Sequence, residues 1–454
     1  MAEIDQASAA EGTAEKRVFI RTFGCQMNEY DTGKMRAKLA KDGFVSTEQP
    51  ENADLILLNT CSVRDKAVVK MHSALGEYRK LKKNGRKVKI GVTGCVAQME
   101  GDALMKKYRD LDLVFGPDGV PHVNELVSKA MDGVRVQDTT FLDLETYPFV
   151  QEVDMDTPVG VGSFVTIQKG CDNKCTFCIV PTTRGAEASR PSDQIIDEVR
   201  QLTARGFKEI TLIGQNVNSY GLKVANECTF AQLLYKVAAV SGVERIRYTT
   251  SHPRDMGDDV IQAYRDLPQL TSHLHLPVQS GSSRILRRMK RFYSRERYLE
   301  VVAKLRDARP DIALSTDIIV GFPGETDADF EETMTLLDEV RFVSSFSFKY
   351  SPRPGTPSLK LRDDVPPEVA SARLTRYQAR QRELGIEYHR KLEGTVLDVL
   401  VEGHSKQDAR VICGRSSSFV MVNFPGELGQ IGRKVSVRVT RGFTHSCRGE
   451  AVEV

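Results

Sequence analysis

Short apolar runs alternate with amphipathic stretches over the first third of the chain. The apolar runs have strand length and lie at Val18–Ile20, Asp54–Asn59, Val88–Val92 and Leu113–Phe115. Segments with helical spacing of apolar positions follow the first three runs, at Glu29–Ala40, from about Lys66, and at Gln98–Tyr108. Strands that alternate with helices predict an α/β domain with a doubly wound parallel sheet, here over residues 17–143.

The same alternation resumes after a polar, proline-bounded segment at Tyr147–Pro158. Six further runs are candidate strands: Phe164–Gln168, Glu209–Ile213, Arg245–Tyr248, His273–Leu276, Ala313–Ile319 and Phe346–Lys349. Helical segments such as Ser192–Ala204 and Arg295–Arg306 fill the gaps between them. Six strand–helix units are fewer than the eight of a closed barrel. The pattern therefore predicts a partial (β/α)6 barrel over residues 157–390.

The C-terminal residues 391–454 change to a two-residue period with Gly and Pro turns. Alternating, β-branched runs occur at Thr395–Val401, Ala409–Cys413, Ser418–Asn423 and Lys434–Val439, after an Arg-rich helical segment at Ala370–Lys391. This pattern predicts a small all-β module. At the other end, Met1–Lys16 is rich in Ala and acidic residues, and we expect it to be a disordered tail.

Composition narrows the class of protein without identifying it. The 454 residues are 40% apolar and 28% charged, with a net charge of +3, so RNA contacts would need local basic patches. No apolar run is long enough to span a membrane, and no secretory signal precedes the first strand. Nine cysteines, an odd number, favour thiols and metal ligands in a reducing compartment. We therefore expect a cytoplasmic protein.

A compact group of three cysteines follows the first strand of the predicted barrel. Cys171, Cys175 and Cys178 have the spacing C-x3-C-x2-C. Structural zinc usually takes four ligands, and no further Cys or His lies within twenty residues of this group. Cysteine thiolates also hold iron–sulfur clusters, and three of them leave one iron of a 4Fe-4S cluster without a protein ligand.

A second group of three cysteines is dispersed in sequence. Cys25, Cys61 and Cys95 each follow a predicted strand of the N-terminal sheet, in a Gly-Cys or Thr-Cys turn. Taken singly, each is more typical of a buried core thiol than of a ligand. Carboxyl ends of parallel strands meet at one edge, where ligands bind in such sheets. We therefore expect these three thiols to converge.

The compact spacing resembles that of the radical S-adenosylmethionine (SAM) superfamily. The sequence segments around the dispersed cysteines, such as Gly24-Cys25-Gln26-Met27-Asn28, resemble those of the methylthiotransferases, which belong to that superfamily. Further segments that resemble this family are Leu212–Tyr220, Leu274–Ser282 and Ser315–Glu325. The C-terminal module resembles the TRAM domain, an OB-like RNA-binding fold. Within the family, the chain is similar to the MiaB-type subgroup.

The resemblance implies two 4Fe-4S clusters and SAM as cofactors. Cys171, Cys175 and Cys178 would hold the cluster that cleaves SAM to a 5′-deoxyadenosyl radical, and Cys25, Cys61 and Cys95 an auxiliary cluster that handles sulfur. It implies methylthiolation of carbon 2 of N(6)-dimethylallyladenosine at position 37, in the tRNA anticodon loop. An electron donor such as a flavodoxin or ferredoxin and the iron–sulfur assembly machinery would be partners of a monomer.

Two other functions remain open from the sequence. The same chemistry could act on threonylcarbamoyladenosine in tRNA or on an aspartate of a ribosomal protein. A non-catalytic iron–sulfur protein that binds RNA and senses redox state would carry the same cysteines.

Further candidate residues fall at strand ends or in basic runs. Those that could contact SAM are Phe177, Gln215, Asn216, Gln279, Asp317, Gly321 and Gly324. Each of them could instead fill a structural role. Cations that could bind tRNA phosphates are Arg287, Arg288, Lys290, Arg291 and Arg380, and Phe419, Phe424 and Phe443 could stack on bases or pack in the core.

Overall fold

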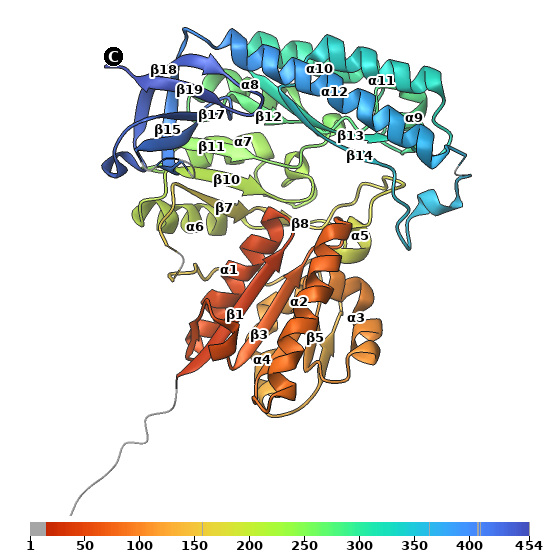
Figure 1. Ribbon diagram of the computed structural model, residues 1–454, viewed down its shortest axis with the longest axis vertical. Helices are drawn as coiled ribbons and strands as arrows, with labels where there is room; N and C mark the ends of the chain where they lie inside the picture. Colours follow the sequence, from red (N-terminus) through yellow and green to blue (C-terminus); the bar gives the residue numbers. More distant parts are fainter. Residues whose placement is uncertain (1–14, 157, 363, 406–407, 409, 454) are drawn as a thin grey trace, which may run out of the picture. The chain divides into compact units, whose positions relative to one another are not determined.

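The computed structural model describes residues 15–156, 158–362, 364–405, 408 and 410–453 (Figure 1). The chain divides into two compact units. Unit 1 comprises Met1–Phe141 and Asp154–Thr157, and unit 2 comprises Leu142–Val153 and Pro158–Val454. The tail expected over Met1–Lys16 lies outside the described residues up to position 14, and the first strand already begins at Lys16.

Unit 1 is built on a six-stranded parallel sheet. Its strands, in the spatial order β2-β1-β3-β4-β5-β6, are β1 (Lys16–Phe23), β2 (Phe44–Ser46), β3 (Leu55–Thr60), β4 (Lys89–Thr93), β5 (Leu113–Phe115) and β6 (Val136–Asp138). The helices are α1 (Gln26–Lys41), α2 (Asp65–Lys83), α3 (Cys95–Lys107) and α4 (Val123–Met131).

Both faces of this sheet are covered, as the continuous apolar strands require. Ile56 and Leu58 of β3 pack in one apolar cluster with α2 and α3. Their strand neighbours Leu55 and Leu57 point to the opposite face and are equally buried. The predicted doubly wound sheet is confirmed, whereas the short strands β2 and β6 at its edges were not predicted.

Unit 2 begins with a partial barrel of six parallel strands in two sheets. Their spatial orders are β11-β10-β7 and β12-β13-β14, with β7 (Gly162–Thr166), β10 (Glu209–Ile213), β11 (Arg245–Tyr248), β12 (His273–His275), β13 (Ala313–Val320) and β14 (Ser344–Lys349). A bridge between Ile246 and Leu270 continues β11 toward β12. The short strands β8 (Gln168–Lys169) and β9 (Ala188–Ser189) pair separately. The predicted six-stranded partial barrel is confirmed.

Helices cover the outer side of this barrel and share one apolar core with its strands. They are α6 (Ser192–Ala204), α7 (Phe230–Ala238), α8 (Asp258–Asp266), α9 (Ser283–Arg288), α10 (Arg295–Ala308), α11 (Asp327–Val340) and α12 (Pro367–Lys391). The short helix α5 (Val180–Thr183) follows the compact cysteine loop and lies outside this core. α11 and α12 lie side by side (Figure 1). No helix in these described ranges has both the length and the apolar character that crossing a membrane requires.

The C-terminal residues form a closed five-stranded barrel, as predicted. Its strands, in the spatial order β15-β16-β17-β19-β18, are β15 (Val396–His404), β16 (Val411–Ser416), β17 (Met421–Pro425), β18 (Lys434–Gly442) and β19 (Cys447–Ala451). Phe424 is fully buried in the barrel core and cannot stack on a base. The fifth strand, β19, was not predicted, and the predicted strand start at Ala409 lies outside the described residues.

The small barrel packs on the N-terminal ends of β11 and β12. Arg245 donates to the carbonyls of Arg415 (2.5 Å) and Asp398 (2.6 Å), and Arg247 donates to Ser416 O at 3.1 Å. The ring of Phe419 stacks on His273 with centroids 5.0 Å apart. Phe419 therefore serves this internal contact, at the strand edge opposite to the one where the compact cysteine loop lies.

Candidate metal centres and cofactor site

Cys25, Cys61 and Cys95 follow the carboxyl ends of three adjacent strands, β1, β3 and β4. The strand order reverses between β1 and β3, and such a switch point is where open α/β sheets bind ligands. The backbone N–H of Cys61 donates to Phe23 O at 2.8 Å, which fixes the Cys61 turn against the end of β1. The structure thus brings the three thiols to one edge, as the sequence predicts.

The environment of these thiols suits an anion that a metal stabilises. A hydrogen bond with Cys25, then burial and the charges of Cys25 and Cys95, raise the pKa of Cys61 far above its usual value. Three such thiols cannot ionise together unless a cation compensates them. Cys25 caps the N-terminus of α1, and Cys95 is the first residue of α3, so two helix dipoles also favour negative charge here.

Two asparagines and two glycines, none of them predicted as site residues, hold the strand ends together. The side chain of Asn28 donates to Asn59 Oδ1, and that of Asn59 donates to Asn28 O, both at 2.8 Å. A Cβ on Gly94 (φ +89°) would lie 2.4 Å from Asn59 Oδ1, and one on Gly24 would lie 2.4 Å from Cys61 Cβ. Gly24 and Gly94 precede Cys25 and Cys95 because the backbone passes close to neighbouring atoms at both turns, which leaves no room for a side chain.

The compact cysteine loop lies directly after β7 and β8 in unit 2. Thr176 ties it to the segment after α9, since its N–H donates to Met289 O at 3.0 Å and its hydroxyl to Arg288 O at 3.1 Å. Burial raises the pKa of Cys171 to about 11 and that of Cys178 to about 12. Phe177 packs edge-on against Phe322, with centroids 6.4 Å apart, and so has a structural role whether or not it touches a cofactor.

Both thiol groups fit the predicted clusters by donor type and setting. Within the described ranges, no three or more His, Cys, Asp or Glu are placed so that they could hold a single metal ion. A four-iron cluster is larger than one ion, and its ligands are correspondingly further apart.

Arg291 is the main correction to the predicted RNA-binding residues. Its side chain is 6% exposed and donates to Cys175 Sγ at 3.3 Å, to Pro277 O at 3.0 Å and to Tyr293 Oη at 3.1 Å. It faces the cysteine loop, so an RNA phosphate cannot reach it. Nothing in the local sequence distinguishes it from its exposed neighbours Arg287 and Lys290.

The remaining cations predicted to bind RNA differ in their solvent exposure and in their hydrogen-bond partners. Arg287 and Lys290 are exposed, whereas Arg288 is half-buried and donates to Pro323 O at 2.9 Å. Arg380 donates to Asp338 Oδ1 at 2.6 Å and to Glu383 at 2.8 Å. RNA binding by these residues stays a prediction, and the two carboxylates argue against it for Arg380.

Gln215 and Asn216 lie beside the compact loop, and each uses only one of its two amide atoms in a hydrogen bond to a described residue. Gln215 Oε1 accepts from the N–H of Gly170 at 2.5 Å, and Asn216 Nδ2 donates to Asp255 Oδ2 at 2.7 Å. Gln215 Nε2 and Asn216 Oδ1 are buried without a hydrogen-bond partner among the described residues. Buried polar atoms without partners suit a polar ligand such as the amino acid end of SAM.

The two glycines predicted to approach SAM are explained by their positive backbone φ without a ligand. A Cβ on Gly321 (φ +69°) would lie 2.7 Å from Ala370 Cβ of α12. One on Gly324 (φ +81°) would lie 2.8 Å from the Arg288 guanidinium. Both glycines are thus required by a tight turn, and SAM contact by either stays a prediction.

Asp317 and Gln279 lie on neighbouring chain segments at the barrel's inner face. The N–H of Gln279 (φ +75°) donates to Asp317 O at 2.9 Å, and Asp317 pairs in register with Phe346 of β14. Phe346 and Phe348 are 60% and 52% exposed, unlike ordinary core phenylalanines. Ser347 between them faces α12, where it accepts from Gln378 at 3.2 Å. An aromatic, exposed surface therefore adjoins the Asp317 carboxylate.

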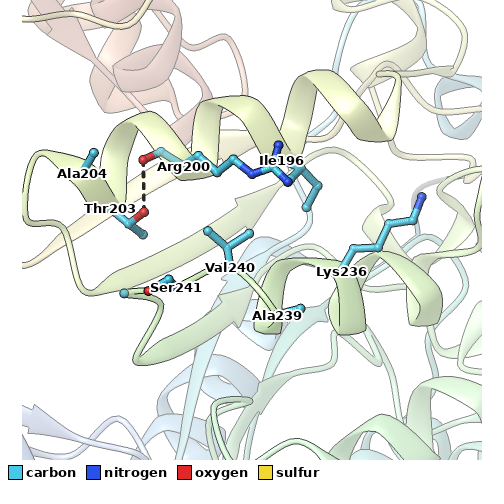
Figure 2. A pocket seen from close by; sticks show the side chains of 9 residues that line it. Ile196, Arg200, Thr203, Ala204, Lys236, Ala239, Val240 and Ser241 are labelled. Carbon is cyan, nitrogen blue, oxygen red and sulfur yellow. Dashed lines mark hydrogen bonds between the residues drawn. The ribbon is translucent and has the colours of Figure 1, made fainter.

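A separate hollow of about 730 Å³ lies between α6 and the end of α7 (Figure 2). Its lining includes Arg200 and Thr203 of α6 and Lys236 of α7. These parts of the helices lead into the N-terminal ends of β10 and β11, away from the cysteine loop. None of the predicted site residues lines it, and we assign it no role.

Three family models match the chain in succession. Residues 17–116 match the Uncharacterized protein family UPF0004, residues 165–337 the Radical SAM superfamily, and residues 390–452 the TRAM domain. A tRNA-2-methylthio-N(6)-dimethylallyladenosine synthase from Geobacter metallireducens is 48% identical over 442 residues, which are 96% of this chain and 99% of the relative.

The chain belongs to the family of the tRNA-2-methylthio-N(6)-dimethylallyladenosine synthases. A second member, from Myxococcus xanthus, is 49% identical over 96% of this chain and 94% of its own length. The radical S-adenosylmethionine methyltransferase TsrM from Kitasatospora setae has a similar fold, with a TM-score of 0.57 at 13% identity. That likeness covers 87% of this chain and 82% of the TsrM chain. The predicted family and fold class are both confirmed.

Proposed function

We propose that this protein methylthiolates carbon 2 of N(6)-dimethylallyladenosine in the anticodon loop of tRNA. The observation that carries the proposal is the second cysteine group. Cys25, Cys61 and Cys95 converge at the switch point of their own sheet, in addition to the compact loop of the partial barrel. Relatives named for this activity match 96% of the chain.

Each cysteine group would hold one 4Fe-4S cluster. The clusters and SAM, when bound, supply the electron, the radical and the sulfur that the residues of the chain lack. Cys171, Cys175 and Cys178 ligate and orient the first cluster. The unpartnered amide atoms of Gln215 and Asn216 bind polar groups of SAM beside it. Cys25, Cys61 and Cys95 ligate the second cluster under the two helix N-termini.

The inner face of the barrel provides a surface for the substrate base. Phe346 and Phe348 expose aromatic area next to Asp317, a hydrogen-bond acceptor. A planar base with an apolar substituent matches an aromatic surface with one polar neighbour. The adenine would leave its stack in the tRNA to reach this face. An electron-donor protein, the iron–sulfur assembly machinery and a cytoplasmic location follow from this chemistry.

Anaerobic turnover on an anticodon stem-loop that carries N(6)-dimethylallyladenosine tests the proposal. The methylthiolated nucleoside, 5′-deoxyadenosine and methionine are quantified together by mass spectrometry. We expect Cys175→Ala to abolish both SAM cleavage and product. Cys61→Ala should retain 5′-deoxyadenosine formation and lose the methylthiolated nucleoside.

Cys413→Ala, a half-buried thiol outside both groups, is the matched control and should behave as wild type. Product formation by Cys61→Ala at the wild-type rate would contradict the auxiliary assignment. Turnover of a threonylcarbamoyladenosine stem-loop or of a ribosomal-protein substrate, with none on dimethylallyladenosine, would support the rival substrates. Clusters without any 5′-deoxyadenosine would indicate a redox sensor.

A further inference from the structure

Arg291 is a buried cation whose counter-charge is missing from the polypeptide. Its hydrogen bonds go to a carbonyl (Pro277 O), a phenol (Tyr293 Oη) and a sulfur (Cys175 Sγ). In the part of the chain that the structure describes, no carboxylate pairs with it. A buried charge without an opposite charge costs several kcal/mol, so it persists only where something compensates it. The atom best placed to do so is Cys175 Sγ, once that thiol is an ionised ligand.

The backbone around Arg291 shows that the contact is built into the fold. Lys290 (φ +55°) and Phe292 (φ +60°) both adopt the left-handed conformation that side chains rarely take. Each costs ~1–2 kcal/mol, and together they turn Arg291 inward between two exposed neighbours. The two hydrogen bonds of Thr176 to Met289 O and Arg288 O hold this segment in register with the cysteine loop.

We propose that Arg291 is a positioning residue that tunes the cluster held by Cys171, Cys175 and Cys178. Its N–H donates a charge-assisted hydrogen bond to the Cys175 thiolate. A reduced cluster carries one more negative charge than an oxidised one, so the guanidinium stabilises the reduced form more. Hydrogen bonds to cluster sulfurs are among the factors that set these potentials. Arg291 therefore raises the reduction potential of this cluster. The inference rests on the proposed function, because it requires the cluster.

The test is a redox titration of the reconstituted full-length protein, followed by electron paramagnetic resonance. The signal of the relevant cluster is identified by its change on addition of SAM. We expect Arg291→Met to lower the equilibrium constant for one-electron reduction of the cluster by about tenfold. This corresponds to a midpoint potential that is ~59 mV more negative. Arg287→Met is the matched control: it removes the same charge from an exposed position nearby and should leave the midpoint unchanged.

Three results separate the alternatives. A wild-type midpoint in Arg291→Met, with full iron content and native circular dichroism, overturns the inference. If that variant fails to fold or to bind iron, Arg291→Gln decides. Glutamine keeps an N–H donor but not the charge, and a charge-assisted hydrogen bond is about twice as strong as a neutral one, so an unchanged midpoint overturns the proposal. A wild-type protein that binds no cluster at Cys171, Cys175 and Cys178 contradicts the proposed function itself.

Discussion

Gly170, directly before Cys171, occupies a position that excludes a side chain. Its φ is +71°, and a Cβ there would lie 1.9 Å from Ala186 O. Its N–H is bound by Gln215 Oε1 at 2.5 Å. We expect Gly170→Ala to cost at least ~1–2 kcal/mol from the backbone conformation alone, and to displace Cys171 from the loop. The measurement is iron content after reconstitution, together with the thermal midpoint.

Gly355→Ala is the control for this variant. Gly355 has a similar φ of +81°, but nothing lies within 4 Å of its Cβ position. It carries the same backbone cost without the collision. Equal iron content in the two variants would show that the close approach at Gly170 does not position the cysteine loop.

His252 gives unit 2 a pH dependence with a defined sign. Burial, and then Arg291 and Arg254, lower the pKa of His252 from 6.5 to about 2. The unfolded state therefore binds a proton that the folded state rejects, so stability is full above pH 6.5 and falls below it. The expected loss at about pH 5 is about 2 kcal/mol.

His252→Asn should weaken this acid response; His273, whose pKa burial lowers to about 3, contributes a further part that remains. Asparagine cannot be protonated, and its side-chain oxygen can accept from Arg254 N, as His252 Nδ1 does at 3.2 Å. The measurement is the thermal midpoint between about pH 7 and pH 5. The exposed His404, changed to Asn, should keep the wild-type slope. Identical slopes in all three proteins would show that His252 is not the group responsible.

The location of a site residue was most predictable where the spacing of residues along the chain defines it. The C-x3-C-x2-C loop and the strand-end cysteines both appear as predicted. Arg291 was misassigned to RNA because its inward direction depends on two left-handed residues that the sequence does not mark. Likewise, Gly321 packs closely against Ala370 of α12, and Gly321 and Gly324 both have a positive φ, which only tertiary structure reveals.

At the scale of elements, long periodic segments were predictable and short edge strands were not. The prediction for β10 (Glu209–Ile213) matches the structure residue for residue, and so does that for α6 (Ser192–Ala204). β2 and β6 have three residues each and lie at the edges of their sheet, where neither burial nor length imposes a clear pattern. The missed edge strands do not affect the predicted site of Cys25, Cys61 and Cys95, because these cysteines follow the central strands β1, β3 and β4.

The contact between the small barrel and β11 depends on Arg245. Its guanidinium satisfies two barrel carbonyls, and its side chain is almost fully buried. Arg245→Met would leave both carbonyls without this donor, at a cost on the order of 2 kcal/mol. We expect the β15–β19 barrel to detach and to melt before the rest of unit 2, visible as a split calorimetric transition.

Arg433→Met is the matched control for this element. Arg433 is exposed on the same barrel, and only its backbone takes part in the contacts with Val401 and Gln430. It should melt as wild type does. A single, unshifted transition in Arg245→Met would show that Phe419 and His273 hold the barrel without the arginine.

At the scale of the whole molecule, the three types of module follow from composition and period, but their contacts do not. Arg245 and Arg247 look like ordinary strand residues in sequence, yet they anchor the C-terminal barrel. Phe424 is fully buried and committed to packing. Phe419 stacks on His273 with one part of its surface but is 44% exposed, and Phe443 is 41% exposed, so RNA could reach both of these rings.

Phe443 lies beside one of two arginines that face each other on neighbouring strands. Arg441 of β18 pairs in register with Arg448 of β19, and the Arg441 guanidinium lies 5.3 Å from the Phe443 ring. Like charges directly opposite in an antiparallel pair destabilise the sheet. An arrangement that is unfavourable in the free protein suits a phosphate that bridges both cations.

We therefore expect Arg448→Gln to weaken binding of the full-length protein to tRNA while leaving folding stability equal or slightly higher. Each phosphate contact releases counterions, so the slope of log affinity against log salt should fall in magnitude by about one. Fluorescence anisotropy over a salt series measures both quantities. Arg433→Gln is the control, because Arg433 is exposed on the same barrel but lies outside the paired residues of β18 and β19. An unchanged slope in Arg448→Gln would place the tRNA phosphates elsewhere on the chain.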